Sequence, residues 1–273
     1  MEPPWKPPTK PSIRRVHELL VQLYGTRTPV VRDPLDGLIL IILSQATNDI
    51  NCDRAFNALK SRYPTWEEVA AAPVEEIANT IRAGGLANQK AARIRQMLVE
   101  MQAESGTLDL AWMHEATARE CIDYLSKFHG VGPKTIACVL VFFLNKPAFP
   151  VDTHVHRVTK RLGWIRPQAG AEEAHRVLEV AIPDELKLDL HVNFITHGRM
   201  VCRADGNGGP RCGECVLRPH CKFGKSLRLR KNDLTAPANE TTAKGDFFVT
   251  LKARHHKPHA PIEKTDVDHG SAQ

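Results

Sequence analysis

Apolar residues recur along this chain at spacings of three and four, which is the period of an amphipathic helix. The first such segment follows Ser12, which can cap a helix, and it ends at Gly25. A uniformly apolar run over 38–43 predicts a buried helix. Further helices are predicted near 50–62, 66–71, 74–82, 88–103, 115–127, 134–144, 153–162, 171–181 and 187–201. No segment shows the sustained alternation of a strand, so the predicted fold class is all-α.

The two ends of the chain differ from this helical pattern. Residues 1–11 are rich in proline, and we expect them to form a flexible lead-in. Residues 232–273 are polar and basic, and we expect them to be mostly disordered, although the apolar segment 247–251 could pack locally. The ordered part of the protein is therefore predicted to lie between these ends.

Composition limits the classes of protein that the chain can belong to. Its 273 residues suffice for one large or two small domains. A formal charge of +6 and a pI near 9.0 suit a nucleic-acid partner, but they are equally typical of an ordinary basic protein. The longest apolar stretch, 136–144, is too short to cross a membrane, and the N-terminus lacks a secretory apolar core. We therefore expect a cytoplasmic protein, associated with the nucleoid if it is bacterial, with no membrane partner.

The stretch FHGVGPKTIACV (128–139) predicts a tight turn between two helices. Gly130 and Gly132 can adopt positive φ and let a ligand approach the backbone around Val131, while Pro133 suits the first position of a helix. Free N–H groups at such a helix start form a site for a phosphate. The same pattern also occurs as a simple turn and in DNA-binding proteins without catalysis, so it does not decide between these functions.

Lys134 and Asp152 are candidates for chemistry. The helix dipole disfavours an ammonium in the first turn of a helix, which favours the neutral and nucleophilic amine of Lys134. Asp152 precedes a helical stretch and is placed to cap it. If the connection over 145–150 turns the chain back, its carboxylate lies beside Lys134 and can take a proton or stabilise a cation.

These motifs resemble those of the endonuclease III family of helix-hairpin-helix DNA glycosylases. GVGPKT (130–135) and VDTHVHRV (151–158) resemble its catalytic core, and the interval between Lys134 and Asp152 matches the family's lysine–aspartate interval. ILSQATND (42–49), GGLANQKAARI (84–94) and HGRMVC (197–202) resemble further family segments. The resemblance covers about residues 19–224 and implies that Gln45 fills the gap left by an extruded base and that Leu86 is the wedge residue. Gly130, Val131 and Gly132 are then expected to contact DNA.

Four cysteines near the end of the helical region indicate a metal site, because clustered cysteines in a reducing compartment more often bind metal than form disulfides. Their spacing, C-x9-C-x2-C-x5-C, suits zinc and an iron–sulfur cluster about equally. The resemblance decides in favour of a [4Fe–4S] cluster. The expected ligands are Cys202, Cys212, Cys215 and Cys221.

The chain departs from the family at this site. The segment ADGNGGP (204–210) widens the usual gap between the first two cysteines. Because a longer loop adds little closure entropy, we expect the cluster to persist. The remaining cysteines, Cys52, Cys121 and Cys138, lie in apolar helical segments and are predicted to be core residues.

The resemblance implies a six-helix domain over 26–146 and an iron–sulfur cluster domain formed by 12–25 and 147–231. It also implies a monomeric, bifunctional DNA glycosylase and AP lyase that acts on double-stranded DNA with damaged bases or abasic sites. Lys134 would attack the sugar, Asp152 would assist, and oxidised pyrimidines would be the substrates. Three alternatives are a monofunctional glycosylase for mismatched or deaminated bases, a non-catalytic DNA-binding module and a zinc-stabilised scaffold.

Overall fold

The computed structural model describes residues 5–28 and 33–227, and within these ranges every regular element is a helix. The predicted all-α class is therefore confirmed for this part of the chain. The α-helices are α1 (Lys10–Tyr24), α2 (Pro34–Ser44), α3 (Asp49–Arg62), α4 (Trp66–Ala71), α5 (Val74–Thr80), α6 (Ala87–Ser105), α7 (Ala118–Leu125), α8 (Pro133–Phe143), α9 (Thr153–Leu162), α10 (Ala171–Ala181), α11 (Lys187–Met200) and α12 (Lys222–Ser226). Short 3-10 helices cover Arg82–Gly84, Ala111–His114, Asp184–Leu186, Asp205–Asn207 and Arg218–His220.

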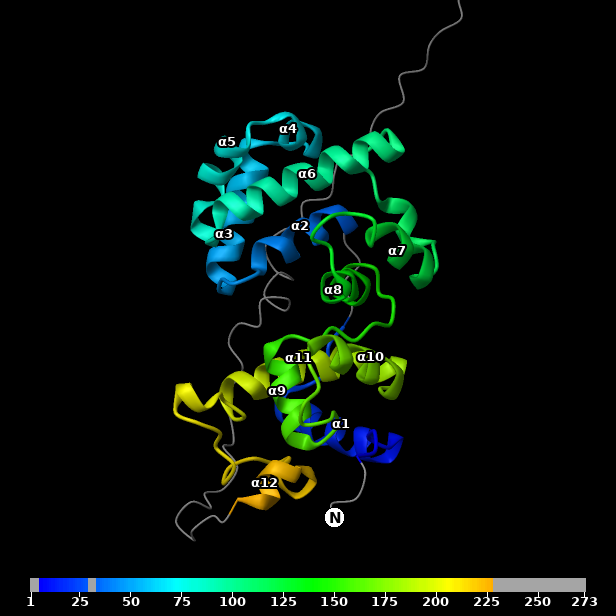
Figure 1. Ribbon diagram of the computed structural model, residues 1–273, viewed down its shortest axis with the longest axis vertical. Coiled ribbons are helices and arrows are strands. Elements are labelled where there is room, and N and C mark those ends of the chain that lie inside the picture. Colours follow the sequence, from blue (N-terminus) through cyan, green and yellow to red (C-terminus); the bar gives the residue numbers. More distant parts are fainter. Residues whose placement is uncertain (1–4, 29–32, 228–273) are drawn as a thin grey trace, which may run out of the picture.

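The described helices pack around two hydrophobic cores. The upper lobe in Figure 1 contains α2 to α8, whose buried residues form one core between Leu35 and Ala148. The lower lobe contains α1 and α9 to α12, whose buried residues form a second core that begins at Ile13 and ends at Cys221. Since α1 packs against α11, the start of the described chain contributes to the lower lobe.

Helix α2 is the centre of the upper lobe because its sequence is almost entirely apolar. Asp33 caps it by accepting a hydrogen bond from the Asp36 N–H at 2.7 Å, and Pro34 occupies its first turn. All residues from Leu38 to Leu43 are buried, so this helix contacts its neighbours on every side. It packs against α3, α6 and α8. The helix over 38–43 that the sequence predicts is therefore present and extends four residues further toward the N-terminus.

The start of α1 differs from the prediction. The helix begins at Lys10, and Ser12 lies inside its first turn instead of capping it. Pro11 explains the earlier start, because proline is favoured in the first turn of a helix. The residues before the helix are not a loose lead-in throughout, since the Trp5 Nε1–H donates to the Gly163 carbonyl at 3.2 Å. The tail predicted over 232–273 lies outside the described residues.

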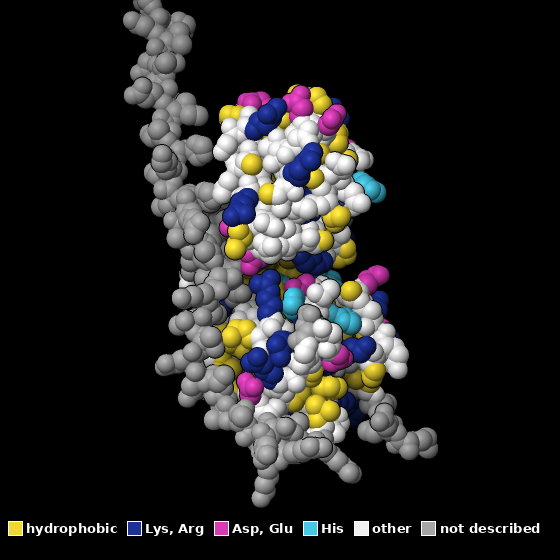
Figure 2. Space-filling model, turned by 90° about the vertical axis from the view of Figure 1, so that its left-hand side faces the viewer, with side chains coloured by type: hydrophobic (Ala, Val, Ile, Leu, Met, Phe, Trp, Pro, Cys, Tyr) yellow, Lys and Arg dark blue, Asp and Glu magenta, His cyan; other side chains and the backbone are white. Residues whose placement is uncertain are grey.

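The two lobes meet beside α8 and α11. Helix α8 belongs to the upper lobe, α11 belongs to the lower lobe, and the two helices are in contact. On the face shown in Figure 2, the surface narrows between the lobes, and Lys, Arg and His side chains gather there. None of the described helices combines the length and the apolar character that a membrane span needs.

Candidate active site

The hairpin turn (128–132) connects α7 to α8 at the edge of the upper lobe. Gly130 has φ +79°, a conformation that strongly favours glycine, whereas Gly132 has φ −87° and needs no such freedom. Helix α8 begins at Pro133 as predicted, and no described side chain caps it. The first N–H groups of α8 are therefore available to a ligand such as a phosphate. Val131 has a buried side chain and donates its N–H to the Phe128 carbonyl, which leaves the two glycines as the open part of the turn.

Lys134 and Asp152 both lie next to the thiol of Cys138. Lys134 is the second residue of α8, and Cys138 follows one turn later on the same face. Burial raises the pKa of the Cys138 thiol, and the Asp152 carboxylate raises it further. The Lys134 ammonium, which also forms a hydrogen bond with the thiol, acts in the opposite direction on this pKa. The structure therefore places the two predicted catalytic residues, both half-buried, near the same buried thiol.

Asp152 is held by the helix that it starts. It is the N-cap of α9, and its Oδ1 accepts a hydrogen bond from the Val155 N–H at 2.7 Å. The capping role that the sequence predicts is therefore present. A carboxylate has two acceptor oxygens, and this cap engages one of them. Capping fixes the side chain before any substrate arrives.

Gln45 and Leu86 lie on two neighbouring loops of the upper lobe. Gln45 follows α2, and the next residue, Ala46, has φ 51°. Leu86 precedes α6, has φ 48° and is 52% exposed, which is unusual for a large apolar side chain. A Cβ placed on Gly85 would lie 3.8 Å from the Ala46 carbonyl oxygen, so the two loops are in contact. The two residues expected to enter DNA therefore lie on adjoining turns.

Lys90 joins these two loops through hydrogen bonds to both of them. The sequence motifs did not single out this residue. Its side chain is buried, and its Nζ donates to the Leu43 carbonyl at 2.7 Å and the Gly84 carbonyl at 2.8 Å. Burial lowers the pKa of this amine. A signal was present in the sequence, because Lys90 lies on the apolar face of α6 that also carries Ile94 and Met97. A lysine on such a face has to find partners inside the protein.

The four predicted ligand cysteines lie around one small cavity in the lower lobe. Its volume is about 20 Å³, and Arg161, Arg218 and Phe223 also line it. Burial is the main cause of the raised pKa values of three of the four thiols, Cys212, Cys215 and Cys221, and the neighbouring thiols add to it. The four cysteines thus line one shared cavity, which a group held by four thiolates would require. Over 5–28 and 33–227, however, no three His, Cys, Asp or Glu side chains converge closely enough to hold a metal ion. The cluster therefore stays a prediction.

Polar groups surround the cysteine sulfurs. His197, which is buried in α11, has its Nε2 3.4 Å from the Cys215 Sγ. The Gly224 N–H donates to the Cys221 Sγ at 3.3 Å, and the Arg161 Nη1 lies 3.4 Å from the Cys202 Sγ. Donors to sulfur and a cation nearby both favour thiolates over thiols. The surroundings of the sulfurs are thus also suited to a thiolate-bound group.

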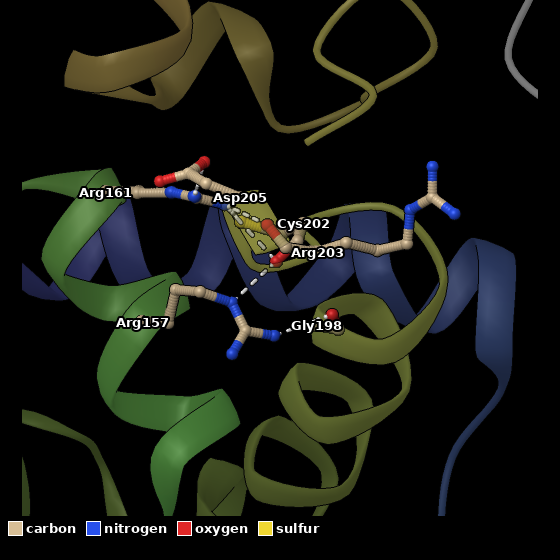
Figure 3. Close-up of polar contacts among 6 residues, drawn as sticks. All are labelled: Arg157, Arg161, Gly198, Cys202, Arg203 and Asp205. Atoms are coloured by element: carbon tan, nitrogen blue, oxygen red, sulfur yellow. Dashed lines mark hydrogen bonds and ion pairs between the residues drawn. The ribbon is translucent and has the colours of Figure 1, made fainter. Parts of the chain in front are cut away.

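Two arginine side chains of α9 hold the chain around Cys202, and one of them also reaches the widened segment 204–210 (Figure 3). Arg161 donates from Nη1 to the Arg203 carbonyl at 2.7 Å and from Nη2 to the Asp205 carboxylate at 3.1 Å. Arg157 donates to the carbonyls of Gly198 and Cys202 at 2.8 and 2.9 Å. The loop is therefore folded against the lobe near the cysteines, not extended away from it.

Comparison with known proteins identifies the family. The family model of the HhH-GPD superfamily of base excision DNA repair proteins matches residues 39–184. The chain belongs to this superfamily. The matched HhH-GPD region contains the hairpin turn, Lys134 and Asp152, and it ends before Cys202.

Several relatives of this HhH-GPD protein carry names related to DNA repair. Endonuclease III of Thermotoga maritima is 34% identical over 191 residues, which are 70% of this chain and 84% of that protein. A protein of Arabidopsis thaliana with the provisional name of DNA glycosylase is 44% identical over 188 residues, 69% of this chain and 61% of its own length. The DNA glycosylase/AP lyase ROS1 of Arabidopsis thaliana is 33% identical over 174 residues, 58% of this chain but only 12% of that longer protein.

Solved structures agree with this assignment. A non-covalent complex of endonuclease III with DNA matches with a TM-score of 0.67 and 31% identity, covering 80% of this chain and 97% of that one. A thermostable thymine-DNA glycosylase matches with a TM-score of 0.65 but only 20% identity, which shows the shared fold alone. The resemblance to endonuclease III that the motifs indicate is therefore confirmed.

Proposed function

We propose that this protein is a bifunctional DNA glycosylase and AP lyase that removes oxidised pyrimidines and cuts the strand on the 3′ side of the resulting abasic site. The observation that carries the proposal is the convergence of Lys134 and Asp152 on the Cys138 thiol. The lysine provides a nucleophile, and the carboxylate provides a proton acceptor. The uncapped N–H groups of the neighbouring hairpin provide a binding site for the phosphates of the DNA backbone. Membership of a base excision repair superfamily supports the same reaction class.

Base release is the first proposed step. The Lys134 ammonium first gives up a proton to solvent, and the lone pair of its Nζ then forms a bond to C1′ of the extruded nucleotide while the bond from C1′ to the base breaks. The electron pair of the broken bond leaves with the base, which takes up a proton. The Asp152 carboxylate accepts the proton that the attacking nitrogen loses, and its charge stabilises the positive charge that develops on the sugar. Capping of α9 holds this carboxylate in place throughout.

Strand cleavage is the second proposed step. Opening of the sugar ring leaves a Schiff base between C1′ and the Lys134 nitrogen, and its positive charge acidifies the protons on C2′. Loss of one of these protons is followed by cleavage of the bond from C3′ to oxygen, and the phosphate leaves with the electron pair. Hydrolysis of the Schiff base then returns the free amine. This sequence needs no oxidant or reductant.

DNA binding would use the features at the edge of the upper lobe. An enzyme that acts on a base has to rotate it out of the duplex and fill the space that it leaves. Leu86, which is exposed although apolar, suits a wedge between bases, and Gln45 on the adjoining loop suits the empty space. The open glycines of the hairpin turn would hold the phosphate backbone without reading its sequence.

A [4Fe–4S] cluster, if bound, would be held by Cys202, Cys212, Cys215 and Cys221, the four cysteines that line one cavity. Its contribution would be structural, since four bonds to sulfur would join the segment after α11 to the segment before α12. The steps described above do not involve it.

Borohydride reduction on a duplex with one abasic site tests the proposal, because it converts a Schiff base into a stable covalent adduct. We expect the wild type to form the adduct and Lys134→Gln to form none. Asp152→Asn should keep the fold but lose base release on a thymine glycol duplex by a factor of roughly 100 or more, the scale of one acid–base group. Lys127→Gln is the matched control, since Lys127 is exposed before the hairpin turn and pairs with Glu104.

The outcomes separate the alternatives. Base release without a trapped adduct would indicate a monofunctional glycosylase. Binding without either reaction would indicate a DNA-binding module. A panel of duplexes that carry thymine glycol, a uracil mismatch or 8-oxoguanine, scored separately for base release and strand cleavage, tests the substrate class. Preference for a lesion other than an oxidised pyrimidine would contradict that part of the proposal.

A further inference from the structure

Arg93 lies between two parts of the proposed DNA-binding surface. It belongs to α6 and is half-buried. Its Nη1 donates to the Gln45 Oε1 at 2.8 Å. On the hairpin side, a Cβ placed on Gly130 would lie 2.5 Å from the Arg93 Nε, so the guanidinium packs directly against the backbone of this glycine. One side chain therefore contacts both the hairpin turn and Gln45.

Helix α6 connects three loops through two cations on its first turns. The loop that carries Leu86 leads directly into α6, which begins at Ala87. Lys90 then joins this loop to the end of α2, and Arg93 reaches Gln45 just beyond that end. The wedge loop, the Gln45 loop and the hairpin turn are thus fixed to a single helix of 19 residues. Such an arrangement keeps their relative positions constant.

The hydrogen bond also fixes the orientation of the Gln45 amide. Arginine has only donors, so it can hold only the oxygen end of a carboxamide. With Oε1 held by Arg93, the two N–H donors of Nε2 point away from the guanidinium. A glutamine held in this way offers donors to whatever occupies the gap, and an unpaired base presents acceptors there. A free side chain would have to lose its rotamer freedom on entering the DNA.

We propose that Arg93 is a positioning residue for base extrusion, which holds Gln45 in the orientation needed for insertion and ties it to the hairpin turn. This inference rests on the proposed function. Arg93 acts through Gln45 and does not contact the reacting atoms. Its loss should therefore slow the release of a base that has to be extruded, and it should have little effect on Lys134 chemistry at an abasic site.

A double-mutant cycle with Arg93→Met and Gln45→Ala tests this coupling. Single-turnover base release is measured on a thymine glycol duplex, with 2-aminopurine next to the lesion to report extrusion. Each single variant should slow base release and extrusion about tenfold, the scale of a hydrogen bond to a charged donor. The double variant should be no slower than Gln45→Ala alone, because the proposed effect of Arg93 on extrusion passes through Gln45.

Three controls separate positioning from a general loss of structure. The ratio of adduct formation on an abasic duplex to base release on a thymine glycol duplex should rise about tenfold in Arg93→Met relative to wild type, since Arg93 does not contact the reacting atoms. Arg95→Met removes a cation from the same helix, where it donates to the Ala72 carbonyl at 2.9 Å, and should leave extrusion unchanged. Arg93→Lys keeps the charge and one donor and should recover part of the loss even if Arg93→Met folds poorly.

The proposal would be overturned by two results. The first is multiplicative losses in the double variant, which would show that Arg93 and Gln45 act independently. The second is extrusion by Arg93→Met at the wild-type rate. These results leave wild-type activity intact, so they differ from a failure of the proposed function, in which the wild type neither releases a base nor forms an adduct. That failure would contradict the Arg93 proposal as well.

Discussion

The hairpin region and the cysteine region were both predicted from short motifs. The geometry of the structure matches the first motif more closely than the second. In the hairpin region, α8 begins at the predicted proline, Gly130 has a positive φ, and Lys134 and Asp152 meet at one thiol. In the cysteine region, four thiols line one cavity, but among the described residues they do not converge as metal ligands. The match to the HhH-GPD family model also includes the hairpin region but not the cysteine region, since it ends at residue 184.

The difference follows from what holds each region together. Helix α8 has eight buried residues, so its position is fixed by apolar contacts within the chain. The cysteine region has only short elements, the three-residue 3-10 helices Asp205–Asn207 and Arg218–His220 and the five-residue α12, and burial raises the pKa of the Cys215 thiol. The first region is complete without a ligand. In the second region, the predicted cluster would replace the protons of four thiols and would join the segments that carry them.

Removal of one cysteine should therefore have the largest effect on stability. We expect Cys221→Ser to lose the yellow-brown colour of an iron–sulfur protein and to destabilise residues 202–226 by more than about 4 kcal/mol. Hydrogen exchange should show the loss in the lower lobe and leave α2 to α6 protected. Cys121→Ala, at a buried cysteine of the upper lobe, is the control and should keep the colour. A colourless wild type, or a coloured Cys221→Ser, would contradict the cluster.

Lys90→Met should have the next largest effect, and it acts on the upper lobe. Two buried carbonyls lose their donor, which costs on the order of 2 kcal/mol in chemical denaturation. The pH dependence sharpens this test. Because burial lowers the pKa of Lys90, the unfolded state binds more protons just below the usual lysine pKa, so folding stability rises with pH in that range.

The stability difference between wild type and Lys90→Met should therefore shift in favour of wild type as the pH is raised toward the usual lysine pKa. A difference that is independent of pH would show that Lys90 titrates alike in the folded and unfolded states. Equal stability of the two proteins at all pH values would contradict the proposal that Lys90 stabilises the upper lobe by joining the end of α2 to the loop before α6.

The hairpin glycines provide a smaller and well-matched comparison. Gly130→Ala places a Cβ at positive φ and against Arg93, so we expect a loss of about 1–2 kcal/mol in the free energy of unfolding. Gly132→Ala has an ordinary φ and meets no atom within 4 Å, so it should be close to neutral. Equal effects of the two substitutions would argue against the close contact between Gly130 and Arg93.

The smallest effect is expected in the widened loop. The Asp205 side chain is 87% exposed, and ion pairs at the protein surface contribute about 1 kcal/mol or less. Asp205→Asn should therefore leave the melting temperature almost unchanged while increasing hydrogen exchange over 204–210. A large loss of stability would show that this loop, and not the cysteines, organises the region.

Much of the fold could be predicted because helix periods and caps are local properties of the sequence. The helices over 66–71, 153–162 and 171–181 have the predicted bounds. Errors arose at ends where two signals compete: Ser12 offers a cap, but Pro11 allows an earlier first turn. Both hairpin glycines can adopt positive φ, but only Gly130 of the two does so, because one such glycine suffices to reverse the chain here.

The candidate site was predictable only where a motif marks it. Lys134 and Asp152 lie in recognisable segments, but Cys138 was predicted to be a core residue only. It is buried as expected, and it also contacts Lys134. Arg93 gave no signal, because its role depends on Gln45 and Gly130, which are 48 and 37 positions away in the sequence and meet only in the folded chain. Contacts of this kind follow from packing, which no periodicity reports.

The most direct test of the account is to identify the residue that carries the DNA after borohydride reduction on an abasic duplex. The trapped protein is digested with protease and nuclease, and the mass of the remaining sugar fragment is located by tandem mass spectrometry. The account predicts that the fragment is attached to the Nζ of Lys134 in the segment that begins α8. Attachment to another lysine or to the N-terminal amine, or strand cleavage without any attached fragment, would contradict it.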